Sequence, residues 1–360
     1  MKAFFEKIIG FLIKRKGEVD DLSKFPDWRV GVSVAADWSW GVSMAVGMSI
    51  MAKKGIAPFL IWMLGNILAI PLVGFVRRFL PDSRHWPKFT LMLLVFAVIE
   101  YFAITLNMQA VLTGLGGGTD VITYSFLPRE AAIWAVVVYG LFIVWYVNKG
   151  GLKILMLTDL GYFTVQMVSA IFIAGASFVM ASGQVNSQLN WAVPGGMAWA
   201  PYAFIGIITG ALAAGHQWQK YDAKAKSIFQ ITLWGGLFFA VYMLFVFLAG
   251  LYFSKNLVLG IAFLVIMVAL ATSTIDSAVS GVGYVARRFG IKSLYAGPII
   301  SVVIIFSWPC INNTTMANMW TNMANFRWPI IVFFIVVTAI IALAKNPKTT
   351  EVFKKLYLIR

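Results

Sequence analysis

Four carboxylates stand inside otherwise apolar stretches of the sequence, and their type suits ion binding or proton transfer. Asp37, Glu100, Asp159 and Asp276 each lie within a hydrophobic run, and we expect no Lys or Arg at comparable depth. One acidic side chain at the centre of a membrane helix costs about 2.5–3.5 kcal/mol on insertion scales. Such residues are normally paired, protonated or set around an ion or a substrate. Packing residues with satisfied hydrogen bonds are the structural alternative.

A hydroxyl-rich stretch, ALATSTIDSAVSG, surrounds the last of these acids. Three serines share one face of a helix there: Ser273, Ser277 and Ser280. Thr274 lies beside them. Hydroxyl and carbonyl oxygens suit a hard cation such as Na⁺, whereas hydroxyls that bond back to helix carbonyls would be structural. Asp276 in the same turn favours the cation site.

The composition indicates that these polar residues are held in a membrane protein. Of 360 residues, 60% are hydrophobic and only 12% are charged, whereas a soluble domain carries about 25% charged residues. We therefore expect an all-α integral membrane protein in contact with the lipid bilayer. We expect no enzymatic activity and no organic cofactor. The net charge of +15 does not indicate a nucleic-acid partner, because the basic residues cluster between apolar runs.

The apolar runs predict ten membrane-spanning helices, since each span needs about 20 mostly apolar residues. We place them near 30–51, 56–76, 89–113, 131–148, 153–180, 199–215, 228–253, 257–285, 294–309 and 328–344. Ten spans divide into five and five, and an odd-numbered half forces the second half to enter with inverted topology. The predicted fold is therefore a 5+5 inverted repeat. One transporter core is expected over 29–345.

The distribution of basic residues predicts that both termini are cytoplasmic. With that orientation, the outer segments hold five basic residues: Lys53, Lys54, Arg129, Lys255 and Arg327. The cytoplasmic segments hold the other 24 of the 29 Lys and Arg, as the positive-inside rule requires. Residues 1–28 read as a cytoplasmic amphipathic segment and 346–360 as a cytoplasmic basic tail. A cell inner (plasma) membrane is the default location, and the oligomeric state is left open.

The first and sixth spans are expected to be discontinuous. The first, VAADWSWGVSMAVGMS, combines an acid with serines and glycines, and the sixth contains Pro201 with several glycines. The two spans occupy corresponding positions in the two halves. Breaks there would expose backbone groups to a cation and a solute at the midplane, although small residues alone also favour close helix packing.

Three segments together resemble the sodium/solute symporter family, which has the LeuT-like fold of the APC superfamily. The segment VNKGGLKILMLTDLGYFTVQM (148–168) is similar to that family's junction between the fourth and fifth helices. HQWQKYDAKAKSIFQ (216–230) resembles its cytoplasmic stretch between core helices six and seven, and 269–281 resembles its pattern on core helix eight. The three occur in family order. The chain would be a short, ten-helix version of that core.

The resemblance implies a sodium site between the first and eighth helices. Its ligands by position would be the carbonyls of Ala35, Trp38 and Leu270 and the hydroxyls of Ser273 and Thr274. It also implies a second ion site or relay, formed by Asp159, Ser277 and Asp276. Na⁺ would then be the coupling ion.

The expected function is Na⁺-coupled symport of a small polar solute, neutral or amine-bearing, by alternating access. The solute site is expected to use Asp37, Ser39, Trp40, Glu100, Asn107 and Tyr202. An acid beside an indole face favours a cationic group. Two alternatives stay open: a proton-coupled carrier of the same fold, in which Asp159 or Asp276 is the relay, and a non-transporting sensor or accessory membrane subunit.

Overall fold

The computed structural model describes most of the hydrophobic core. The described residues are 22, 24–41, 43–76, 90–116, 125–224, 227–252, 257–291, 295–311 and 332. The predicted amphipathic segment, apart from its last residues, and the basic tail lie outside them. The predicted tenth span near 328–344 also lies outside them, except for one residue.

The described residues form helices and no strands. The helices are α2 (Asp27–Trp38), α3 (Ser43–Lys54), α4 (Ile56–Val76), α5 (Thr90–Gly116), α6 (Arg129–Met180), α7 (Gly196–Ile208), α8 (Gly210–Ala213), α9 (Gly215–Ala223), α10 (Ile228–Tyr252), α11 (Leu257–Arg288) and α12 (Ala296–Ile311). The all-α prediction is therefore confirmed for this part of the chain.

Six helical stretches of the described residues are long and apolar enough to cross a membrane: 56–75, 94–116, 129–180, 196–213 (α7 with α8), 228–252 and 257–288. Large hydrophobic side chains such as Trp134, Val168 and Leu237 are exposed on them, as lipid contact requires. The chain is thus an integral membrane protein. The arrangement as ten helices in a 5+5 repeat stays a prediction.

The 52-residue helix α6 contains two predicted spans joined at a kink. Gly151, at the kink, has φ 54° and ψ −155°, a conformation that only glycine adopts readily. The boundary between the fourth and fifth predicted spans therefore falls where the sequence has Gly150 and Gly151, although no loop separates them.

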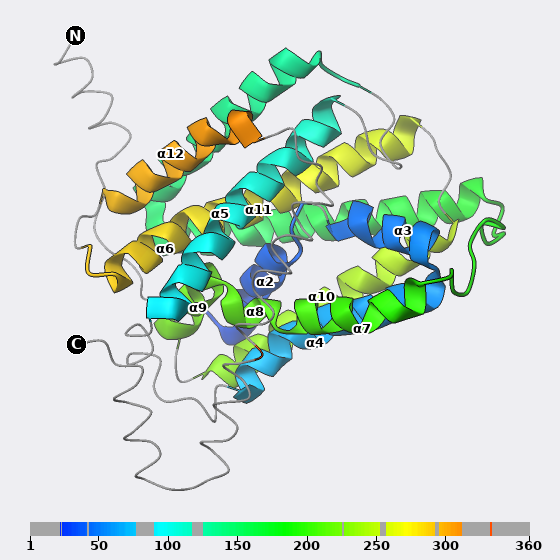
Figure 1. The fold of residues 1–360 in the computed structure, drawn as a ribbon, viewed down its shortest axis with the longest axis horizontal. Helices are drawn as coiled ribbons and strands as arrows, with labels where there is room; N and C mark the ends of the chain where they lie inside the picture. Colours follow the sequence, from blue (N-terminus) through cyan, green and yellow to red (C-terminus); the bar gives the residue numbers. More distant parts are fainter. Residues whose placement is uncertain are drawn as a thin grey trace, which may run out of the picture.

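The helices pack in two groups with α2 between them (Figure 1). On one side α11 packs along α5 and α6, and α12 packs against α11. On the other side α4 packs against α7 and α10. Helix α2 contacts α10, α6 and α11, so residues of α2 have neighbours from both groups.

The segment between α6 and α7 is hydrogen-bonded to three other helix ends. The carbonyls of Asn190 and Trp191 accept the first two N–H groups of α4, at N···O distances of 3.0 and 2.9 Å. The N–H of Asn186 donates to a carbonyl in the last turn of α10, at an N···O distance of 2.9 Å. The N–H of Val193 donates to the final carbonyl of α3, at 3.0 Å. The segment therefore satisfies backbone groups that a helix end leaves unpaired.

Candidate functional site

The first predicted span is broken in its middle, as expected. Helix α2 ends at Trp38, and Trp40 in the following turn has φ 34°, which is uncommon for a residue with a side chain. The N–H of Gly41 donates to Asn107 Oδ1 on α5 at 2.6 Å. A Cβ on Gly41 would lie 2.8 Å from Ala271 Cβ on α11. Only glycine therefore lets the turn approach α11 so closely.

The sixth predicted span is also interrupted. Helix α8 is four residues long, and Ala214 after it has an extended backbone (φ −91°, ψ 111°). Helix α9 then begins at Gly215 and ends after nine residues. The described backbone therefore leaves the helical conformation after Trp38 and at Ala214, and α9 carries Lys220 into the interior.

Lys220 corrects the expectation that no basic residue lies near the buried acids. Its side chain is completely buried, and its Nζ contacts a carboxylate oxygen of Asp37 and lies 3.1 Å from Asp159 Oδ2. It also lies 2.5 Å from Ser33 Oγ and 3.3 Å from Ser277 Oγ. The predicted loop position of Lys220 was wrong, because Lys220 lies in helix α9 and its ammonium pairs with carboxylates of α2 and α6. Asp37, Asp159, Asp276 and Lys220 are called the buried cluster below.

Hydroxyls from α11 complete the surroundings of Asp37 and Asp159. Ser273 Oγ donates to Asp159 Oδ1 at 2.9 Å and lies 3.2 Å from Asp37 Oδ1, and Ser277 Oγ donates to Asp37 Oδ1 at 2.8 Å. Thr274 Oγ1 lies 3.2 Å from the carbonyl oxygen of Asp37 and 3.1 Å from that of Leu270. Thr274, a predicted sodium residue of α11, thus lies beside the backbone of α2 at Asp37.

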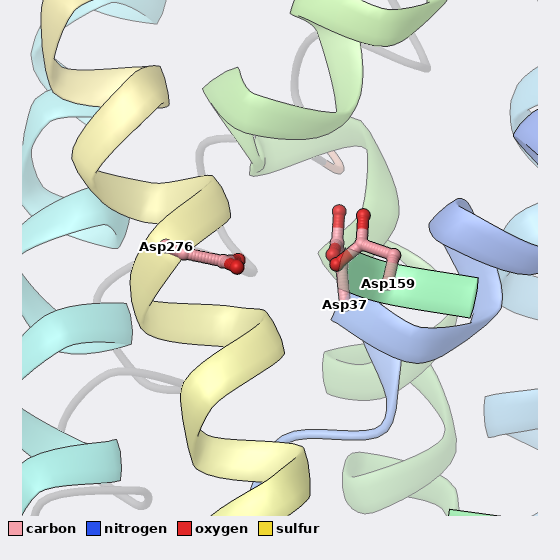
Figure 2. A group of neighbouring side chains, drawn as sticks. All are labelled: Asp37, Asp159 and Asp276. Carbon is pink, nitrogen blue, oxygen red and sulfur yellow. The ribbon is translucent and has the colours of Figure 1, made fainter. Parts of the chain in front are cut away.

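Asp276 adds a third buried carboxylate to the cluster. Figure 2 shows it extending from α11 toward Asp37 and Asp159, which lie side by side. One carboxylate oxygen from each of the three lies within 4.8 Å of the others. Asp276 Oδ2 accepts a hydrogen bond from Tyr146 at 2.6 Å. Its Oδ1 is buried and has no hydrogen-bond partner among the described residues.

Glu100, expected at the solute site, is instead paired with His216. Both side chains are buried. Glu100 Oε1 accepts the backbone N–H of His216 at 2.9 Å, and His216 Nδ1 lies 3.0 and 2.9 Å from the two carboxylate oxygens. The sequence offered no partner for His216, because Glu100 is 116 residues away along the chain.

The chain that carries this site is similar in structure to a known transporter. A variant of the manganese transporter of Eremococcus coleocola aligns with a TM-score of 0.51 and 13% sequence identity, over 91% of this chain and 81% of the other. A second variant of that transporter aligns with a TM-score of 0.49 and 13% identity, over 88% and 78%. No protein-family model and no curated protein sequence matches this chain.

The chain has the fold of a membrane transporter. This likeness supports a transporter fold in general and does not single out the sodium/solute symporter family. At 13% identity it shows the fold and leaves the residues that bind cargo to be argued from this chain.

Other predicted site residues of this transporter fold lie around the break after α2. Ser39 Oγ donates to the carbonyl of Ala35 at 2.8 Å and accepts a hydrogen bond from Gln166 at 2.6 Å. Trp38 and Trp40 are buried. Tyr202 does not join them, because its side chain on α7 is 71% exposed.

Proposed function

We propose that this chain is a secondary transporter driven by a cation that binds at the buried cluster. The support is the charge of that cluster: three buried carboxylates lie close together, and one ammonium group pairs with two of them. If all four groups are ionised, two negative charges remain uncompensated. Because uncompensated charge is costly inside a membrane protein, the cluster favours a further cation or proton.

Na⁺ is the coupling ion that we propose first. Thr274 Oγ1 lies beside two backbone carbonyls, and the end of α2 presents carbonyl oxygens at the negative end of the helix dipole. Ser273 and Asp159 add oxygens nearby. Unwound backbone and helix C-terminal ends of this kind coordinate Na⁺ in other transporters with broken helices.

The solute that we propose is small and polar, neutral or amine-bearing. Asp37, Ser39 and Trp40 lie at the break where a solute would meet exposed backbone groups. Asn107 holds the turn at Gly41, so its role in the solute site is indirect. Entry of one Na⁺ across about 100 mV releases roughly 2.3 kcal/mol, enough for about 50-fold accumulation of a neutral solute.

A divalent metal ion is a second candidate for the cargo. Three carboxylate oxygens within 4.8 Å of one another can surround one ion, and hard divalent cations take carboxylate ligands. The similar solved structure is that of a manganese transporter. A proton gradient is the alternative driving force, because buried carboxylates can carry protons.

The test is uptake into proteoliposomes with defined gradients. Purified protein receives an inward Na⁺ gradient, an inward proton gradient or neither, with a defined mixture of amino acids and amines outside or with Mn²⁺ outside. We expect Na⁺-driven accumulation of an amino compound that Asp159→Asn abolishes. Tyr202→Phe, a change on the exposed face of α7, should leave uptake unchanged. If neither gradient drives accumulation of any of these cargoes, the proposal is wrong.

A further inference from the structure

The Lys220 ammonium is surrounded by the kinds of oxygen atoms that would surround a bound metal cation. Its Nζ is fully buried and has oxygen neighbours from three helices: α2, α6 and α11. The neighbours are two carboxylates, two hydroxyls and the carbonyl of Ser33 at 3.4 Å. Carboxylate, hydroxyl and carbonyl oxygens are also the ligands that a hard cation takes.

We propose that Lys220 is a tethered cation that competes with the free coupling cation for Asp37 and Asp159. Lys220 thereby sets the affinity of the buried cluster for that ion. This inference rests on the function proposed above, since it assumes that a free cation binds there.

Competition between Lys220 and a free cation is expected because both are positively charged and because Asp276 Oδ1 is an oxygen that Lys220 does not contact. Asp276 Oδ1 is buried without a partner among the described residues. Figure 2 shows Asp276 extending from α11 across from Asp37 and Asp159, the two carboxylates that pair with Lys220. A free cation that uses this oxygen together with Asp159 comes close to the ammonium. Two like charges at such a distance repel strongly in a buried site, so the ammonium must withdraw from Asp159 when the cation binds.

The short helix α9 gives the ammonium a route to withdraw. Helix α9 has nine residues, with non-helical backbone at Ala214 before it and at Lys224 after it. Its other side-chain contacts tie it to α5 through His216 and Glu100 and to α11 through Gln219 and Ser280. Gln217 Nε2 also donates to the carbonyl of Val34 on α2 at 3.4 Å. Lys220 is its link to Asp159 on α6 and to Asp37 on α2. Cation binding would therefore release α9 from α6, while its contacts with α5 and α11 and the hydrogen bond from Gln217 to α2 remain.

The experiment measures Na⁺ affinity in purified full-length protein. Isothermal titration with NaCl, at an ionic strength held constant with N-methylglucamine chloride, compares the wild type with Lys220→Met and Lys220→Arg. We expect Lys220→Met, which removes the charge but keeps the length, to bind Na⁺ roughly tenfold tighter or more, because a repelling charge is lost. Lys220→Arg keeps the charge and should show no gain. Lys224→Met removes the neighbouring ion pair with Asp27, outside the cluster, and should leave the affinity unchanged.

A second pair of variants covers the case in which Lys220→Met does not fold. Asp159→Asn is compared with Lys220→Met/Asp159→Asn, in which one carboxylate and the ammonium are removed together. The double variant should again bind Na⁺ more tightly than the single one.

The inference would be overturned if Lys220→Met bound Na⁺ no more tightly than the wild type, or if the double variant bound Na⁺ no more tightly than Asp159→Asn. In that case Na⁺-driven uptake by the wild type would still support the proposed function. Absence of cation binding in every variant, together with absence of gradient-driven uptake, would overturn both.

Discussion

A methyl group added at Gly281 should break the buried pair between Glu100 and His216. A Cβ at this position on α11 would lie 2.7 Å from Glu100 Cδ and from Oε2, and 3.0 Å from Oε1. Carbon atoms in contact are normally about 3.5–4.0 Å apart. The carboxylate cannot simply move aside, because His216 holds it through its backbone N–H at 2.9 Å and through Nδ1.

The cost of Gly281→Ala follows from these contacts. Overpacking a well-packed interior costs about 1–3 kcal/mol, and losing one hydrogen bond to a charged group costs about 1.5–3 kcal/mol. Alanine in place of glycine regains up to about 1 kcal/mol of helix propensity. The variant should therefore lose about 2–5 kcal/mol of unfolding free energy, which lowers the unfolding temperature by on the order of 3–7 °C.

Thermal unfolding of the purified protein in detergent measures this loss, with Gly283→Ala as the matched control. A Cβ at Gly283, two residues along the same helix, would have its nearest neighbours at 3.7 and 3.8 Å, so this alanine fits and should cost nothing. In a Glu100→Ala background, Gly281→Ala should cost little more, since the clashing carboxylate is gone. If Gly281→Ala is as stable as Gly283→Ala, the described packing of α11 on α5 is refuted.

Three further substitutions test the break after α2 and the proposed sodium site. Asn107→Ala removes the acceptor of the Gly41 N–H and should lower the unfolding free energy by about 1–3 kcal/mol, measured in the same unfolding assay; an unchanged unfolding temperature would contradict the assigned contact. Ser273→Ala and Thr274→Ala each remove one oxygen near the end of α2 and should raise the Na⁺ concentration for half-maximal uptake. Unaltered Na⁺ dependence in both variants would remove these hydroxyls from the proposed ion site.

The elements of the fold were predictable where the signal is local. Apolar runs of span length located the helices, because a membrane requires that length. The break after α2 was predictable because an acid, serines and glycines interrupt one span, and the structure places Trp40 and Gly41 in that turn. The resemblance assigned Asp159 and Ser277 to one ion site and Ser273 to another, whereas Ser273 donates a hydrogen bond to Asp159 and Ser277 donates one to Asp37.

The charge pairs were not predictable, because they join residues far apart in the sequence. Lys220 lies 183 residues from Asp37, within the polar stretch HQWQKYDA, which by composition alone indicates a solvent-exposed loop. The burial of Lys220 results from its carboxylate partners, and no periodic pattern contains them. The position of Tyr202 away from the predicted solute site has another reason. Helix α7 is apolar on every face, so its sequence does not indicate which face meets lipid.

The hydrogen-bonded segment between α6 and α7 has a mechanical consequence for the whole molecule. It fastens the end of α3, the start of α4 and the end of α10 to the segment that leads into α7. Pulling any one of these ends from the others would break backbone hydrogen bonds, each contributing about 0.5–1.5 kcal/mol net. These four ends therefore behave as one rigid block. An opening at this end of the protein has to run along the boundary between that block and helices α5, α6 and α11.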